Sequence, residues 1–210
     1  MDFSLQRIDE YFDEYIFGYM FQDISGAIDI KANYLAALGL SVYTEVMGGL
    51  VTGNLKSHED SGANYRAFLP YLGLHYVELE EKIRIWKRVR CGLIHEYFVK
   101  EPSLIALKFK EENLPGIYYL ENINTVIVAV EHYFKDFKSG VKKYYEELKN
   151  GDSDLIAKFE QATNAPSGAI YIHEAVKVST KFSFDHISVG RLTWKRDDPP
   201  PGKSANSSNR

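Results

Sequence analysis

The sequence predicts a mainly α-helical fold, a helical bundle with one small β-hairpin. Three observations predict it: apolar residues recur at helical spacing through the first half, a second long apolar stripe follows residue 122, and the period changes toward alternation between residues 103 and 120. At 210 residues the chain is long enough for one domain with a substantial core. We expect a single helical domain over residues 1–195 and a disordered tail over 196–210, where Pro, Ser and Asn leave little to bury.

The first half is predicted to contain four helices. The longest shows Ile24, Ile28, Leu35, Leu38, Val42 and Val46 at helical spacing, and we expect Gly48, Gly49 and Gly53 to close it. Pro70 is expected to lie at the end of a short helix. The predicted spans are about residues 4–20, 24–52, 62–70 and 75–97.

The second half is predicted to begin with the hairpin. Ile105, Leu107 and Phe109 alternate with less apolar residues, and the turn sequence "NLPG" precedes "IYYL". A clear apolar stripe then predicts a helix from about residue 123 to 148, with Asn122 as its N-cap and Gly151 beyond its end. Residues 153–163 favour another helix, and alternation over 170–184 favours a C-terminal strand or two.

Composition excludes several classes of protein. The net charge is −4, so the chain has no overall positive field for coating DNA, and any contact with RNA requires a local basic cluster. Cys91 is the only cysteine, which excludes an intrachain disulfide framework and a multi-cysteine metal site. The acidic N-terminus does not resemble a secretory signal, and we see no apolar run approaching the roughly 20 residues that span a bilayer. We expect a cytoplasmic protein with no membrane contact.

The predicted helix over 75–97 contains an arginine in an unexpected place. On a helical wheel Arg90 falls within an apolar stripe made by Leu79, Ile83, Trp86, Leu93, Ile94 and Tyr97. Arginine is almost never buried without a partner, because removing its charge from water costs several kcal/mol. An anionic group is therefore expected close to Arg90.

The opposite face of the same wheel is basic. It carries Arg84, Arg88, Cys91 and His95, with Lys87 at its edge, and is a candidate phosphate-binding patch. Ordinary solvated i,i+4 pairs, Glu78 with Lys82 and Glu80 with Arg84, are the alternative interpretation. In an unbroken helix Arg90 and His95 point about 140 degrees apart. They can then share a ligand only if Gly92 permits a bulge or a helix end, or if two copies meet about a twofold axis.

The spacing Arg90, four residues, His95, one residue, Tyr97 resembles the R-x-x-x-x-H-x-Y signature of HEPN domains. These are helical modules of prokaryotic toxin, defence and RNA-processing systems. The string "RCGLIHEYF" is similar to the form "RNGLIHEYF" of uncharacterised bacterial members, and "MGGLVTG" and "NYRAFLPYL" upstream also resemble that group. The resemblance covers roughly residues 27–100.

The resemblance implies a helical bundle that dimerises and acts as a metal-independent endoribonuclease. His95 from two copies would serve as base and acid while Arg90 holds the phosphate, with Arg84, Lys87 and Arg88 as further RNA contacts. The residue after the motif arginine is usually polar in the family, most often Asn, and here it is Cys91, a poorer hydrogen-bonding group. In some members a partner nucleotidyltransferase, an antitoxin, adenylylates the motif tyrosine, which makes Tyr97 a candidate for such control.

Other sites have less support. His58, His75, His132, His173 and His186 lack metal-ligand spacing, and neither a P-loop nor a G-x-G-x-x-G motif is present, so we expect no metal and no cofactor. Cys91 lies four residues before His95, but no third group in the sequence orients such a pair as a nucleophile. Two functions remain open: an HEPN-type ribonuclease, and a non-catalytic HEPN-like module that binds RNA or nucleotide or forms oligomers.

Overall fold

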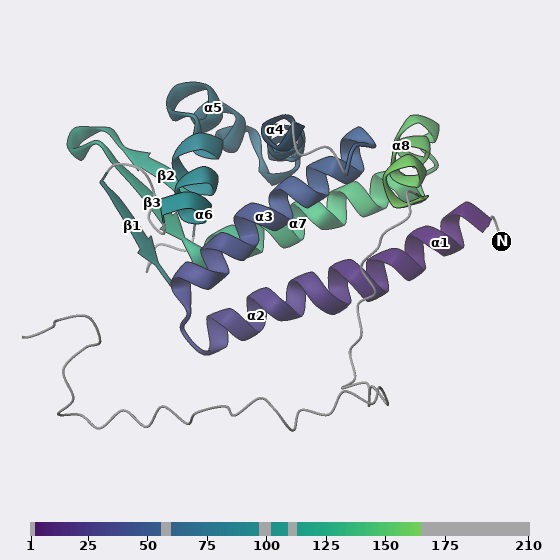
Figure 1. The fold of residues 1–210 in the computed structure, drawn as a ribbon, viewed down its shortest axis with the longest axis horizontal. Helices are drawn as coiled ribbons and strands as arrows, with labels where there is room; N and C mark the ends of the chain where they lie inside the picture. The colour runs from purple at the N-terminus through teal and green to yellow at the C-terminus, as the bar shows by residue number, and fades with distance from the viewer. Residues whose placement is uncertain (1–2, 56–59, 97–101, 109–112, 165–210) are drawn as a thin grey trace, which may run out of the picture. The chain divides into compact units, whose positions relative to one another are not determined.

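The computed structural model describes residues 3–55, 60–96, 102–108 and 113–164 of the chain (Figure 1). All of them belong to one compact unit, Met1–Gly168. The predicted strands near 170–184, the predicted domain end at residue 195 and the tail over 196–210 lie outside the described residues. Within the described residues the prediction of a mainly helical fold with a small β element is confirmed.

The chain begins with one helical run that is longer than predicted. α1 (Phe3–Tyr11) continues through a π-helical segment (Phe12–Met20) into α2 (Phe21–Asp29). The run ends where Lys31 adopts a positive φ of 59° and the Ala32 N–H donates to the Ala27 carbonyl at 2.8 Å. The predicted helix over 24–52 is therefore two helices, because this turn separates α2 from α3.

α3 (Asn33–Thr52) and α4 (Ser61–Leu72) form the most extensively packed helix pair. A Cβ at Gly48 would lie 1.6 Å from the Asn64 carbonyl oxygen, so the two backbones can approach this closely only at glycine. Gly48 and Gly49 thus lie inside α3, and only Gly53, with φ of 78°, ends it. The expectation that all three glycines close this helix was wrong for the first two.

α5 (Leu74–Ile83) follows α4 after Gly73, and it is shorter than the predicted helix over 75–97. Arg84 takes a left-handed conformation with φ of 56° and stops α5. A second helical stretch follows, π-helical over Trp86–Cys91 and α-helical in α6 (Gly92–Glu96).

The sheet has three strands in the order β1-β3-β2. β3 (Thr125–Ala129) is central, and it pairs parallel with β1 (Ser103–Ala106) and antiparallel with β2 (Ile117–Leu120). The predicted hairpin between β1 and β2 was therefore wrong in its pairing. The hairpin joins β2 to β3 through a 3-10 turn, Glu121–Ile123, that ends at Asn124 with φ of 48°.

α7 (Val130–Lys149) starts seven residues later than predicted, because the apolar run Val126–Ala129 belongs to the buried central strand. A short apolar run fits a buried strand as well as a helix, so periodicity alone could not place this boundary. Asn122 consequently lies in the 3-10 turn and caps no α-helix. α8 (Ser153–Asn164) matches the predicted last helix.

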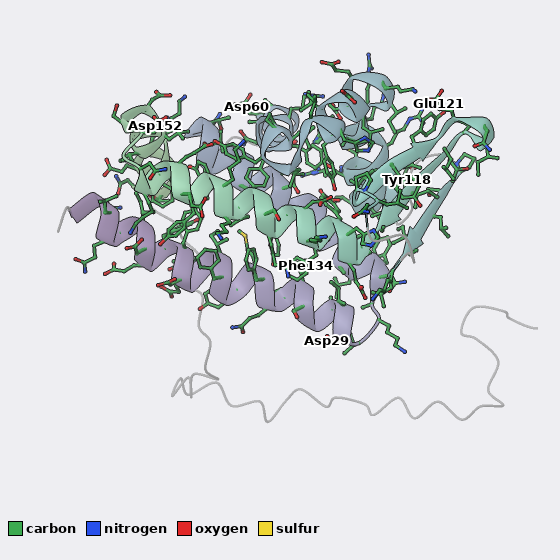
Figure 2. All side chains as sticks on the ribbon, turned by 180° about the vertical axis from the view of Figure 1, so that it is seen from behind. Asp29, Asp60, Tyr118, Glu121, Phe134 and Asp152 are labelled. Atoms are coloured by element: carbon green, nitrogen blue, oxygen red, sulfur yellow. The ribbon has the colours of Figure 1, made fainter. Side chains whose placement is uncertain are left out.

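The core lies between α3, α4, α7 and the N-terminal run. Figure 1 shows α3 and α7 side by side, with the sheet at one end of this helical layer and α8 at the other. The hydroxyls of Thr44 and Tyr133 lie 2.8 Å apart, and that of Tyr65 is 3.5 Å from Tyr133, so one buried polar cluster joins α3, α4 and α7. Figure 2 labels Phe134 on α7, which meets Phe21 edge-on at 5.8 Å.

Candidate functional site

The motif lies in the second helical stretch, after the break at Arg84. The Arg84 N–H donates to the Glu80 carbonyl at 2.9 Å, and the Glu80 side chain accepts the Trp86 N–H at 2.8 Å. Glu80 therefore acts at both helix ends: its carbonyl accepts the N–H at the end of α5, and its side chain caps the start of the next helical stretch. A helical wheel over residues 79–97 was the wrong geometry for this segment, since its direction changes at Arg84.

The winding of the second stretch also differs from an ordinary helix. Residues Trp86–Cys91 are π-helical, and Gly92, with φ of −61°, continues the helix into α6. The bulge that we considered at Gly92 thus lies directly before it. The 140-degree separation of Arg90 from His95 assumed α-helical winding throughout and does not apply here.

Arg90 has the expected anionic neighbour, and it is a carboxylate of the same chain. Nε of Arg90 lies 2.6 Å from Oε2 of Glu45 on α3, with side chains that are 15% and 19% exposed. Neither atom has a hydrogen-bond partner within the described residues, because the N–H does not point along the line between them. The pair is therefore a close ion pair without the directed fork geometry that arginine and carboxylate often adopt.

His95 is exposed on α6, so its imidazole is accessible from solvent. No hydrogen bond or ion pair joins it to Arg90 within the described residues. Cys91 is a half-buried free thiol on the same stretch. Tyr97 lies outside the described residues, so the structure gives no position for the third motif residue.

The predicted basic face is divided between two surfaces. Arg84 and Lys87 are exposed and line an open depression next to the break, together with Arg66 from α4. Arg88 instead lies over the Tyr119 ring of β2, 5.9 Å from its centroid. Arg88 therefore does not join the depression that the other two predicted RNA contacts line.

Sequence reasoning missed three residues of this region: Glu45, Arg66 and Glu80. A signal existed for Glu45, because it is the single charged residue in the twenty residues of α3. A carboxylate in so apolar a helix is expected to face a cation. Arg66 carried the same kind of signal, because it is the single charged residue of α4. Glu80 carried none, since Glu78, Glu81 and Lys82 surround it in the sequence.

Exposed apolar side chains occur on α6 and on two elements of the same region. Ile94 beside His95, Leu35 at the start of α3 and Leu104 on β1 are all exposed. They come from three elements that pack together, since α3 contacts both α6 and β1. Exposed apolar side chains gathered in this way are typical of protein interfaces.

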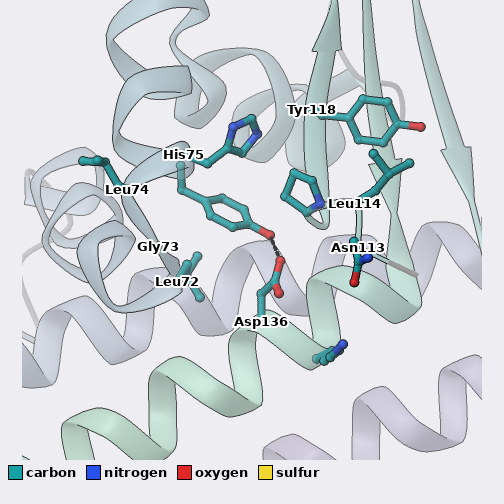
Figure 3. A pocket seen from close by; sticks show the side chains of 11 residues that line it. Leu72, Gly73, Leu74, His75, Asn113, Leu114, Tyr118 and Asp136 are labelled. Carbon is teal, nitrogen blue, oxygen red and sulfur yellow. Dashed lines mark hydrogen bonds between the residues drawn. The ribbon is translucent and has the colours of Figure 1, made fainter. Parts of the chain in front are cut away.

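A cavity of about 600 Å³ lies away from the motif between α5, α7 and the start of β2 (Figure 3). In it the Tyr76 hydroxyl donates to Asp136 at 2.5 Å, and the Gly116 N–H contacts both of these side chains at 2.9 Å. Burial, together with the Asp136 charge, raises the pKa of Tyr76 well above its ordinary value, so this hydroxyl remains a donor. These groups satisfy one another's hydrogen bonds and hold the chain at Gly116 against α5 and α7.

Two further observations concern metals and membranes. Within residues 3–55, 60–96, 102–108 and 113–164, no three His, Cys, Asp or Glu side chains gather as a metal site. α3 is long and apolar enough to cross a membrane by length and composition, in contrast to the sequence-based expectation, but half of that stretch is buried within the fold. Its packing against α4 and α7 is that of a core helix.

No family model matches the chain, and neither a curated protein nor a solved structure matches it.

Proposed function

We propose that the protein is a metal-independent endoribonuclease of the HEPN type that acts as a homodimer. The observation that carries this proposal is the placement of two motif residues on one helical stretch: Arg90 is held against Glu45, and His95 is exposed to solvent. A cation held in place and an accessible imidazole on one helical stretch supply two of the groups that RNA cleavage needs.

The chemistry requires few groups, because RNA carries its own nucleophile. A base removes the proton of the 2′-hydroxyl, that oxygen attacks the adjacent phosphorus, and an acid protonates the leaving 5′-oxygen. Histidine titrates near neutral pH and serves either role. Arg90 stabilises the extra negative charge that develops on the phosphate oxygens.

One His95 can occupy only one protonation state at a time, so if His95 supplies both the base and the acid, two chains are required. The exposed side chains of Ile94, beside His95, and of Leu35 and Leu104, on elements packed in the same region, support a twofold contact that would bring both imidazoles into one cleft. Each Ile94 would be covered by the partner copy while the neighbouring His95 faces the cleft.

Glu45 has a defined role in this proposal. Its carboxylate contacts Arg90 at Nε, and it accepts no hydrogen bond from the two terminal nitrogens within the described residues. Those nitrogens form the outer edge of the planar guanidinium, which suits a phosphate. Glu45 would thus fix the orientation of Arg90 and leave its phosphate-binding edge free.

Cleavage of a defined single-stranded RNA tests the proposal. We expect the purified protein to produce fragments ending in 2′,3′-cyclic phosphate, with equal rates in the presence of EDTA. His95→Ala and Arg90→Ala should each reduce the rate by at least about 100-fold, in line with the loss of a general acid–base or charge-stabilising group. His95 is exposed, so its variant should unfold at the wild-type temperature. Cleavage that persists in His95→Ala, purified identically, would refute the proposal.

A non-catalytic HEPN-like module that binds RNA or nucleotide is the second candidate, and the Glu45 contact favours it. If that contact serves only to neutralise a half-buried charge, Arg90 is structural. Arg90→Lys separates the two functions, because lysine keeps the charge but lacks the planar fork. Cleavage that falls sharply in Arg90→Lys while stability is kept supports the enzyme. Absence of turnover by the wild-type protein supports the module.

A further inference from the structure

The break at Arg84 creates an open depression of about 400 Å³ on the surface. Its lining comes from α4, from the end of α5 and from the start of the next helical stretch. We name it the basic depression, and its lining residues are Arg66, Glu80, Glu81, Arg84, Trp86 and Lys87.

Arg66 is held in a fixed orientation at this depression. Its Nε donates to Glu80 Oε1 at 2.8 Å, and its guanidinium carbon lies 5.3 Å from the centroid of the Trp86 ring. The side chain nevertheless remains 49% exposed. A guanidinium anchored at Nε and stacked on an indole keeps its terminal nitrogens available as donors.

The charge balance of the basic depression is positive. Glu80 is buried and both of its oxygens are engaged, Oε1 by Arg66 and Oε2 by the Trp86 N–H. Arg84 and Lys87 form no side-chain ion pair within the described residues and are exposed. Glu81 is the one other carboxylate of the lining, so two unpaired cations and a partly available Arg66 face a single carboxylate.

We propose that the basic depression is a phosphate subsite for the RNA strand, in which Arg84, Lys87 and the terminal nitrogens of Arg66 contact one backbone phosphate. This inference rests on the proposed function and extends it. It adds Arg66, which sequence reasoning missed, and it removes Arg88, which lies over Tyr119. The second helical stretch runs from Trp86 to Glu96, so the subsite and His95 are a few nucleotides apart along a bound strand.

Binding by the full-length His95→Ala protein tests the subsite, since bound RNA should then stay intact. We would measure the fluorescence anisotropy of a labelled single-stranded RNA over a series of salt concentrations. Lys87→Ala should weaken binding about threefold to tenfold at low salt and should reduce the slope of log K against log salt by about 0.7, the value for one phosphate contact on a single strand. Glu81→Gln should strengthen binding, because it removes the remaining carboxylate from the lining.

Lys82→Ala is the matched control. It changes the net charge by the same amount, but Lys82 pairs with Glu121 and lies near the Tyr119 ring, outside the basic depression. We expect its affinity to stay within about twofold of the parent protein, as for a charge without a phosphate contact. Equal weakening by Lys82→Ala and Lys87→Ala, or no RNA binding by the His95→Ala protein at low salt, would overturn the subsite. If the variants rank as expected but the wild-type protein does not cleave RNA, the subsite stands and the ribonuclease proposal fails.

Discussion

The contact between Arg90 and Glu45 places two opposite charges where little water reaches them. Their side chains are 15% and 19% exposed, so each charge relies on the other to offset lost hydration. The sequence indicated that Arg90 needs an anion, because its neighbours on the wheel are apolar. It could not identify Glu45, since 45 residues separate the two and only the packing of α3 on the second helical stretch brings them together.

Glu45→Gln tests this dependence. We expect the free energy of unfolding to fall by about 2 kcal/mol, because a half-buried guanidinium loses its charged partner. Glu146→Gln is the control, as its pair with Lys142 is exposed on α7 and should contribute no more than about 0.5 kcal/mol. Urea denaturation of both variants measures the difference. Equal losses of unfolding free energy in the two variants would show that the Arg90–Glu45 pair stabilises the protein no more than an exposed pair does.

Gly48 is the residue on which the closest helix crossing depends. Gly48→Ala would place a Cβ 1.6 Å from the Asn64 carbonyl oxygen, and backbone atoms cannot move aside as a side chain can. We expect a loss of about 3 kcal/mol or more in unfolding free energy, at or above the upper range for overpacking. Gly26→Ala is the matched change on α2, where no atom lies within 4 Å, and it should be neutral or stabilise by up to about 1 kcal/mol. Thermal melts followed by circular dichroism compare the two, and similar melting temperatures would contradict the close approach of α3 and α4.

At the scale of helices and strands, prediction succeeded where one physical cause acts over many residues. The stripe that includes Phe134, Phe137, Val141, Tyr144 and Leu148 identified α7, because an amphipathic helix repeats its pattern over several turns. Prediction failed where the structure depends on one local contact or on residues that are far apart in the sequence. The buried run Val126–Ala129 is compatible with a strand as well as with a helix. It forms a strand because it pairs with β1 and β2.

The break at Arg84 shows why the candidate site could be predicted only in part. The motif spacing identified Arg90 and His95, but the sequence favoured a continuous helix, since no glycine or proline lies between residues 74 and 91. The Glu80 side chain stabilises the break by accepting the Trp86 N–H, and no sequence rule specifies that contact. The basic depression exists only because of this break, so its lining could not be predicted either.

The docking of α1 on α7 is expected to depend on pH through Asp9. Hydrogen bonds from Lys149 and Tyr145, at 2.6–2.7 Å, lower the pKa of Asp9 in the folded protein. A lowered folded pKa means that the stabilisation is complete above the unfolded value of about 3.9 and is lost as the pH falls through the folded pKa. The site is largely exposed, so we expect no more than about 1 kcal/mol. Asp9→Asn should therefore be less stable than the wild type at pH 6, with the gap in unfolding free energy closing as the pH falls below the unfolded value and through the lowered folded pKa. Urea denaturation of the wild type and the variant, at pH 6 and at the lower pH, measures this difference in unfolding free energy. A difference that is unchanged at low pH would contradict this linkage.

For the molecule as a whole, the described core draws on residues from one end of the first unit to the other. Every residue of the buried cluster lies between Ile8 and Ala162, and Phe159 on α8 stacks near Phe12 of the N-terminal run with ring centroids 6.1 Å apart. The two ends of this unit are thus held in one core. Such a core is expected to unfold in one cooperative transition.

Truncation after Gly168 tests whether this unit is sufficient. Because the described core contains no residue beyond Ala162, we expect the shortened protein to unfold in a single transition within about 3 °C of the full chain, which corresponds to about 1 kcal/mol for a domain of this size. A second truncation after Gly151 is the control, since it removes α8 and with it Phe159 and Ala162 from the core. That variant should lose several kcal/mol, because it exposes the aromatic face of Phe12 that α8 covers. A large loss of stability in the first truncation would mean that residues 169–210 cover part of this core and that the folding unit extends toward the predicted boundary at residue 195.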